Sequence, residues 1–63
     1  MEINVLDVYY MNDMYFMVVD IKNDKIKTYN QLGEYVTYDK SDMYVADYKG
    51  SLLEEVRLIR LIR

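Results

Sequence analysis

The chain of 63 residues is long enough for one small domain, spanning residues 1–63, and its 52% hydrophobic content predicts a packed core rather than disorder. It contains no cysteine and no histidine, which excludes disulfides and the usual zinc sites. No stretch reaches the roughly 20 apolar residues of a membrane span. The start, MEINVLDVYY, lacks the basic region of a signal peptide, so a cytoplasmic protein without a membrane role is expected.

The formal net charge of −3 is unevenly distributed along the chain. Residues 1–55 hold all eleven acidic residues and five lysines, whereas residues 56–63 hold the three arginines and no acid. An acidic body disfavours a phosphate backbone as partner, because that affinity comes mainly from lysine and arginine. Eight tyrosines, many Ile, Asn, Asp and Lys residues and no proline fit AT-rich codons, which favours an origin in a low-GC bacterium or one of its phages.

Two Asn-Asp pairs divide the first half of the chain, in MNDM at 11–14 and in KNDK at 22–25. Asparagine and aspartate tolerate the left-handed backbone that two-residue hairpin loops require. We therefore predict three antiparallel strands, over about 2–11, 14–22 and 25–31.

The first loop pairs Tyr10 with Tyr15 and Val8 with Met17, and the second pairs Ile21 with Ile26, Asp20 with Lys27 and Val18 with Tyr29. These registers assign one face of the sheet to the core, because apolar residues and opposite charges then pair across strands. The expected core face comprises Leu6, Val8, Tyr10, Tyr15, Met17, Val19, Ile21 and Ile26. The expected solvent face comprises Asp7, Asp20, Lys22, Lys25 and Lys27, with Val5, Phe16 and Val18 among them. This alternation is typical of an antiparallel sheet with one solvated face.

The second half of the chain predicts another hairpin and a C-terminal helix. Gly33 marks a turn, and strands over about 34–38 and 43–48 follow, joined by a four-residue loop that pairs Tyr38 with Met43. In SLLEEVRLIRLIR, Ser51 and Glu54 form a capping box for a helix over about 51–62. A sixth strand over 56–62 is the alternative for this segment.

Five strands at regular spacing, followed by one short helix, predict a mainly β (β-rich α+β) fold. We expect an antiparallel meander that curls into a small barrel or half-barrel. The spacing is similar to that of SH3-like and OB-like barrels, although no motif residue assigns the chain to either family.

Catalytic and metal chemistry are not expected. Histidine and cysteine are missing, and the adjacent acids Asp39 and Asp42 are explained by a turn. The stretch DIKNDK at 20–25 departs from a calcium loop, because Lys25 stands where glycine is required and the distal Glu is absent. We therefore expect a protein that is not an enzyme and holds no cofactor or metal.

Three tyrosines share one face of the second predicted hairpin, and this patch is either core beneath the helix or a contact surface. In the second case the partner-binding residues are Tyr35, Tyr44, Tyr48, Asp42 and Asp47. On this hypothesis the chain is a non-catalytic protein-binding module. It would be a phage or mobile-element inhibitor or adaptor of a host protein, and a narrower version is mimicry of nucleic acid to block a nucleic-acid enzyme.

Two alternative functions remain open at this point. One is a nucleic-acid-binding small barrel that uses the lysine face and the arginine tail. Its contacts would be Lys22, Lys25, Lys27, Tyr29, Arg57, Arg60 and Arg63. The other is a structural subunit of a homo-oligomer, which could use the same residues as its seam.

Overall fold

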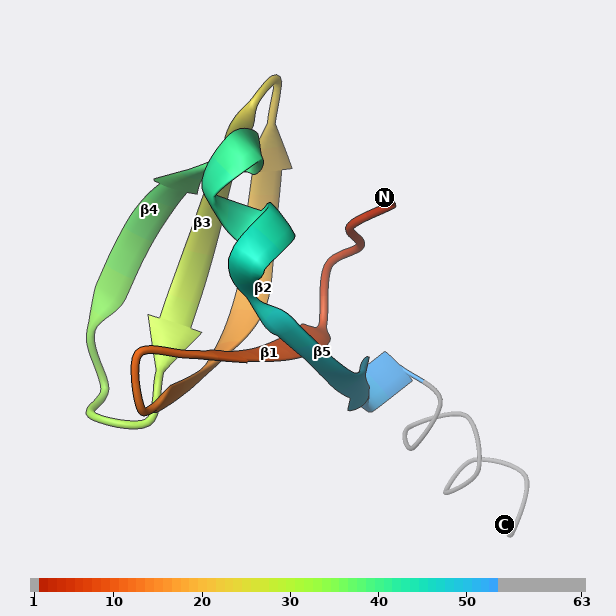
Figure 1. Ribbon diagram of the computed structural model, residues 1–63. Coiled ribbons are helices and arrows are strands. Elements are labelled where there is room, and N and C mark those ends of the chain that lie inside the picture. Colours follow the sequence, from red (N-terminus) through yellow and green to blue (C-terminus); the bar gives the residue numbers. More distant parts are fainter. Residues whose placement is uncertain (1, 54–63) are drawn as a thin grey trace, which may run out of the picture.

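The computed structural model describes residues 2–53, and these form one five-stranded antiparallel sheet with little helix (Figure 1). The strands are β1 (Asp7–Met11), β2 (Met14–Lys22), β3 (Lys25–Asn30), β4 (Tyr35–Asp39) and β5 (Asp47–Ser51). A 3-10 helix, η1 (Lys40–Val45), connects β4 to β5. The predicted mainly β fold is confirmed.

The strand order is β4-β3-β2-β1-β5, so the last strand returns to pair with the first. The predicted meander is therefore right for β1 to β4 and wrong for β5. Because β4 and β5 stand at opposite edges of the sheet, it is not closed into a barrel. The sheet is nevertheless strongly bent, with β1 and β5 running across the direction of β3 and β4 (Figure 1).

Both predicted Asn-Asp hairpins are confirmed. Asn12 and Asp13 have φ angles of 53° and 60°, the left-handed pair that a tight hairpin loop needs. Asn23 has a φ of 57° in the second loop. The predicted pairs Tyr10–Tyr15, Val8–Met17, Asp20–Lys27 and Ile21–Ile26 are all present.

A β-bulge at Val19 reverses the predicted faces of the sheet. Val18 pairs with Thr28 and Asp20 pairs with Lys27, so Val19 has no partner and Val18 does not pair with Tyr29 as expected. One extra residue shifts the side-chain alternation by one position. The fully buried apolar side chains are Tyr9, Phe16, Val18, Ile26 and Met43.

The predicted core face is consequently wrong for β1 and for the first half of β2. Phe16 and Val18, expected on the solvent side, are buried, whereas Tyr15 is exposed and Met17 is only partly buried. Ile26, on the other side of the bulge, is buried as predicted. The bulge brings these two halves of the hairpin into one core.

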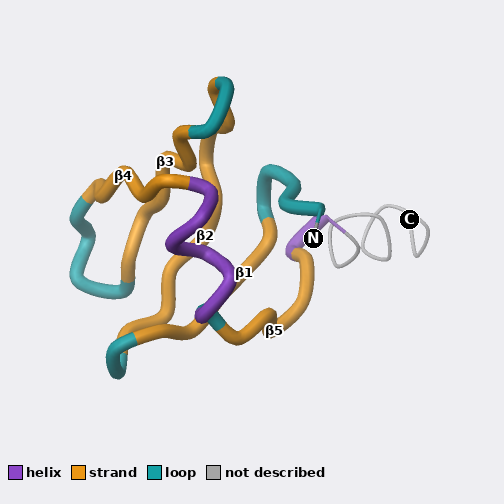
Figure 2. The backbone as a smooth tube through the Cα atoms, turned by 45° about the horizontal axis from the view of Figure 1, so that its top comes forward, coloured by secondary structure: helices purple, strands orange, loops and turns teal. Residues whose placement is uncertain are grey.

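The predicted strand over 43–48 is also wrong, because η1 continues to Val45 and β5 begins only at Asp47. The Asp42 carboxylate accepts a hydrogen bond from the Asp39 backbone N–H at 3.3 Å, as in the first turn of a capped helix. This turn places Met43 in the core and lays η1 across the concave side of the sheet (Figure 2). The cross-strand pair expected between Tyr38 and Met43 therefore does not exist.

The predicted C-terminal helix over 51–62, like the alternative strand over 56–62, falls almost wholly outside the described residues. Within them, the Ser51 hydroxyl accepts a hydrogen bond from the Leu53 N–H at 3.2 Å. This is the contact expected of Ser51 as a helix N-cap.

Candidate functional site

The predicted partner surface is dispersed over three elements. Tyr35 lies on β4, Tyr44 on η1 and Tyr48 on β5, and β4 and β5 are opposite edges of the sheet. The three side chains are 65%, 63% and 58% exposed, so they are surface residues but do not form one patch. Asp42 and Asp47 are also exposed, the first on η1 and the second on β5.

The convex side of the sheet carries a continuous group of apolar side chains, which we call the tyrosine face. Its residues are Val8, Tyr10, Tyr15, Met17, Tyr29 and Tyr35. The registers place four of them in one row, in which Val8 pairs with Met17, Met17 with Tyr29, and Tyr29 with Tyr35. This row crosses β1, β2, β3 and β4 on the side opposite to η1.

Two pairs of tyrosine rings frame the tyrosine face. The ring centroids of Tyr29 and Tyr35 lie 4.9 Å apart, and those of Tyr10 and Tyr15 lie 4.6 Å apart. Both distances are in the range of favourable aromatic pairs. A shallow hollow of about 190 Å³ lies between the pairs, with Val8 and Met17 in its lining.

A lysine stands over one ring at each end of this face. The Lys27 Nζ lies 5.0 Å from the centre of the Tyr35 ring, and the Lys49 Nζ lies 5.8 Å from that of Tyr10. The Tyr10 hydroxyl donates a hydrogen bond to Asp13 at 3.1 Å, and this bond is the main cause that raises the pKa of Tyr10. The face is thus apolar in its middle and mixed in charge at its rim.

The predicted lysine surface is only partly free to bind an anion. Lys22 and Lys25 are cross-strand partners beside the β2–β3 turn, and Lys25 forms an ion pair with Asp39 of β4. Its bond to this carboxylate raises the pKa of Lys25. Lys27 pairs with Asp20 across the strands, so acids accompany two of these lysines.

The remaining predicted nucleic-acid or oligomer contacts are Tyr29 and the three arginines. Tyr29 belongs to the tyrosine face, where it meets Tyr35 from the other predicted surface. Arg57, Arg60 and Arg63 lie outside the described residues.

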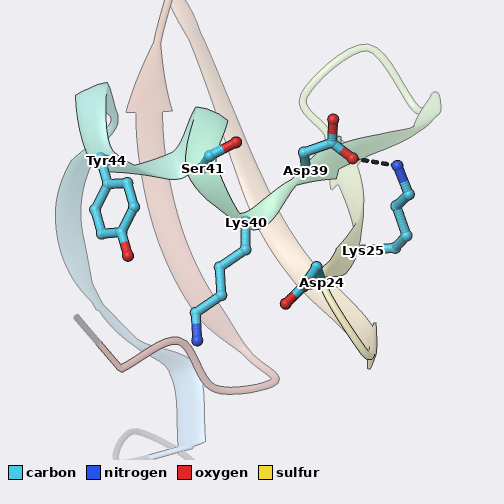
Figure 3. A pocket seen from close by; sticks show the side chains of 6 residues that line it. All are labelled: Asp24, Lys25, Asp39, Lys40, Ser41 and Tyr44. Carbon is cyan, nitrogen blue, oxygen red and sulfur yellow. Dashed lines mark hydrogen bonds and ion pairs between the residues drawn. The ribbon is translucent and has the colours of Figure 1, made fainter.

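A larger hollow of about 530 Å³ opens between the β2–β3 turn and η1 (Figure 3). Its lining residues are Asp24, Lys25, Asp39, Lys40, Ser41 and Tyr44. The Lys40 side chain lies between Tyr44 and Asp24, and Lys25 points to Asp39. The two acids and two lysines of this lining balance in charge.

The comparisons with known proteins add no information about this site. No protein family, curated protein or solved structure matches this chain. Over residues 2–53, no three His, Cys, Asp or Glu side chains gather as metal ligands. The described part of the chain also has no helix with the length and apolar character to cross a membrane.

Sequence reasoning missed the tyrosine face because both faces of the first hairpin are apolar. Tyr9 and Tyr10 are neighbours, and so are Tyr15 and Phe16, so alternation alone does not decide which member of each pair points inward. The available signal was chemical. Phe16 is the one aromatic residue without a hydroxyl, and it belongs in the core more readily than Tyr15.

Proposed function

We propose that this chain is a non-catalytic protein-binding module and that the tyrosine face is its contact surface. The observation that carries this proposal is the row of four apolar side chains across four strands, which within residues 2–53 lies on the side of the sheet away from η1. Contiguous exposed apolar patches on small proteins mark interaction sites. Tyrosine and methionine are enriched at the centres of such interfaces, and tyrosine is frequent among their hot spots.

The rim of the face supports a protein partner of mixed charge. Lys27 and Lys49 supply cations, while Asp13 and Asp47 supply carboxylates near Tyr10. A polar rim of both signs around an apolar centre is the usual arrangement of a protein–protein contact. As a finer form of the proposal, the partner is a host protein that a phage or mobile element inhibits or recruits through this chain.

Nucleic acid is the second candidate partner, because a specific observation favours it. Lysines over Tyr35 and Tyr10 resemble the combination of stacking surface and positive charge that binds single strands. The excess of acids over residues 1–55 opposes it, since phosphates would be repelled. A third candidate is a homo-oligomer joined through the tyrosine face. This candidate is excluded if the molecular mass in solution remains that of a monomer over a wide concentration range.

The test is capture from lysate of a low-GC bacterium on the immobilised chain, with and without nuclease. Three baits are compared, namely the wild type, the double variant Tyr29→Ser/Tyr35→Ser, and the matched control Tyr44→Ser. The control removes a tyrosine of similar exposure that lies outside the tyrosine face. Hot-spot losses of about 2 kcal/mol per residue correspond to about 30-fold in affinity.

We expect a nuclease-resistant protein that binds the wild type and Tyr44→Ser but not the double variant. Loss of all captured material with nuclease would replace the protein partner by nucleic acid. Binding that survives in the double variant and disappears in Tyr44→Ser would move the contact surface to η1 and overturn the proposal.

A further inference from the structure

A pocket of about 400 Å³ opens on the concave side of the sheet, beside the N-terminal residues and β5. Its lining residues are Glu2, Asn4, Asp7, Tyr9, Ala46 and Tyr48. Because side chains alternate along a strand, Asp7 and Tyr9 point to the opposite side of β1 from Val8 and Tyr10. This Asp7 pocket is therefore separate from the tyrosine face.

The Asp7 carboxylate is 4% exposed, which is unusual for an acid. It accepts a hydrogen bond from the Asn4 N–H at 2.9 Å and also interacts with the Tyr9 side chain, and a carboxylate has acceptor positions for more. Buried carboxylates normally pair with a cation. The described lining of the pocket contains no lysine or arginine, and the ion pair between Lys25 and Asp39 lies elsewhere.

The residue before this carboxylate has a strained backbone. Leu6 has a φ of 76°, a left-handed conformation that costs a leucine about 1–2 kcal/mol. Its N–H donates to the Val18 carbonyl at 2.8 Å, and its own carbonyl accepts from the Leu52 N–H at 3.0 Å. Bonds to β2 and to the residue that follows β5 thus hold Leu6 in place, and the Asp7 side chain is fixed toward the pocket.

Two tyrosine rings line the pocket next to the carboxylate. Tyr9 is 1% exposed and lies deep in it, while the largely exposed Tyr48 lies at its mouth. Their centroids are 5.5 Å apart in an edge-to-face arrangement. Burial, followed by the charge of Asp7, by Tyr48 and by the hydrogen bond with Asp7, raises the pKa of Tyr9.

We propose that the Asp7 pocket binds the guanidinium group of an arginine from a partner protein. The guanidinium would form an ion pair with Asp7 and stack on the ring of Tyr48, with Glu2 as a further acid at the rim. Arginine is favoured over lysine because its planar group is more weakly hydrated and stacks on aromatic rings. The inference rests on the proposed protein-binding function only in that the arginine belongs to a protein.

The test is a titration of the full chain with N-acetyl-arginine amide, followed by the backbone NMR signals of the lining residues. N-acetyl-citrulline amide is the neutral probe of the same shape, and N-acetyl-lysine amide is the second cation. We expect saturable shifts with the arginine probe at millimolar concentration, smaller shifts with lysine and none with citrulline. Equal shifts with arginine and citrulline, or no shifts at all, would overturn the proposal.

Two variants locate the site, and one serves as control. Asp7→Asn keeps an acceptor for the Asn4 N–H but removes the charge, and it should weaken arginine binding about tenfold or more. Tyr48→Ser changes an exposed side chain and should weaken it about threefold or more. Asp24→Asn changes the net charge equally at an exposed position outside the pocket and should leave binding unchanged. Unchanged binding in both pocket variants would remove Asp7 and Tyr48 as contacts and overturn the proposal.

The two proposals fail in distinguishable ways. The Tyr29→Ser/Tyr35→Ser variant should lose its protein partner and still bind the arginine probe. If the arginine probe binds nowhere while the partner still requires Tyr29 and Tyr35, only the pocket assignment is wrong.

Discussion

Replacing Met43 by alanine should remove a large part of the stability of this protein. Met43 is 0% exposed and is the buried residue through which η1 packs on the sheet. Each buried group of methylene size contributes about 0.8 kcal/mol, so loss of three such groups costs about 2.4 kcal/mol, and the cavity raises this to about 3 kcal/mol. At about 0.05–0.15 kcal/mol per residue, a chain of 63 residues has a total stability of only about 3–9 kcal/mol.

The matched control is Met17→Ala, the same change on the partly exposed tyrosine face. It should cost about 1 kcal/mol or less. Urea denaturation followed by far-UV circular dichroism measures both free energies of unfolding, and thermal melting should place Met43→Ala about 12–24 °C below the wild type. If Met17→Ala costs as much as Met43→Ala, the tyrosine face is not the solvent side of the sheet, and the bulge at Val19 has been misplaced.

Two further predictions concern a buried hydrogen bond and alkaline pH. Thr28 is fully buried and its hydroxyl donates to the Val36 carbonyl at 2.8 Å, so Thr28→Val should cost about 1 kcal/mol in urea denaturation. The exposed cross-strand control Thr37→Val should cost less, and equal losses would contradict the role of the bond. The pKa of Tyr9 is raised by burial and by Asp7, so its folded state binds the phenolic proton more tightly than the unfolded chain. Its contribution to stability is complete below about pH 10 and is lost as pH rises through the folded pKa. Tyr9→Phe should therefore flatten the loss of stability above about pH 10 in denaturation curves, and an unaltered slope would argue against a raised pKa.

Local signals in the sequence predicted the second and third strands closely, whereas the first strand, expected from about residue 2, begins only at Asp7. Asn12, Asp13 and Asn23 of the two Asn-Asp pairs occupy left-handed positions in the structure, and β2 spans Met14–Lys22 as expected. A two-residue loop fixes the register of the strands it joins, so the pairs next to each turn followed directly. This information is contained in a few neighbouring residues, and no distant contact was needed to read it.

The candidate sites could not be predicted in the same way. Tyr29 and Tyr35 were assigned to two different surfaces, and Asp7 was expected on the solvent face of the sheet. The misplacement of Asp7 traces to the alternation of side chains, which one extra residue at Val19 inverts. Tyr35 was separated from Tyr29 for another reason, because the strand expected over 43–48 was paired with β4, whereas β4 pairs with β3 and lies at the opposite edge from β5. The neighbouring residues Val18 and Val19 are identical, so the sequence itself does not mark which of them is unpaired.

The sequence by itself determined the mainly β class and the first two hairpins. Because it contains no cysteine and no histidine, it also excludes the chemistry that depends on those side chains. Tertiary structure alone decided which face is buried, where β5 pairs and what η1 covers. The physical reason is that both faces of the first hairpin carry aromatic and aliphatic side chains, so burying either would remove similar apolar area from water. Met43, arriving from η1 after four strands, packs on one of the two faces and leaves the other, with its tyrosines, exposed.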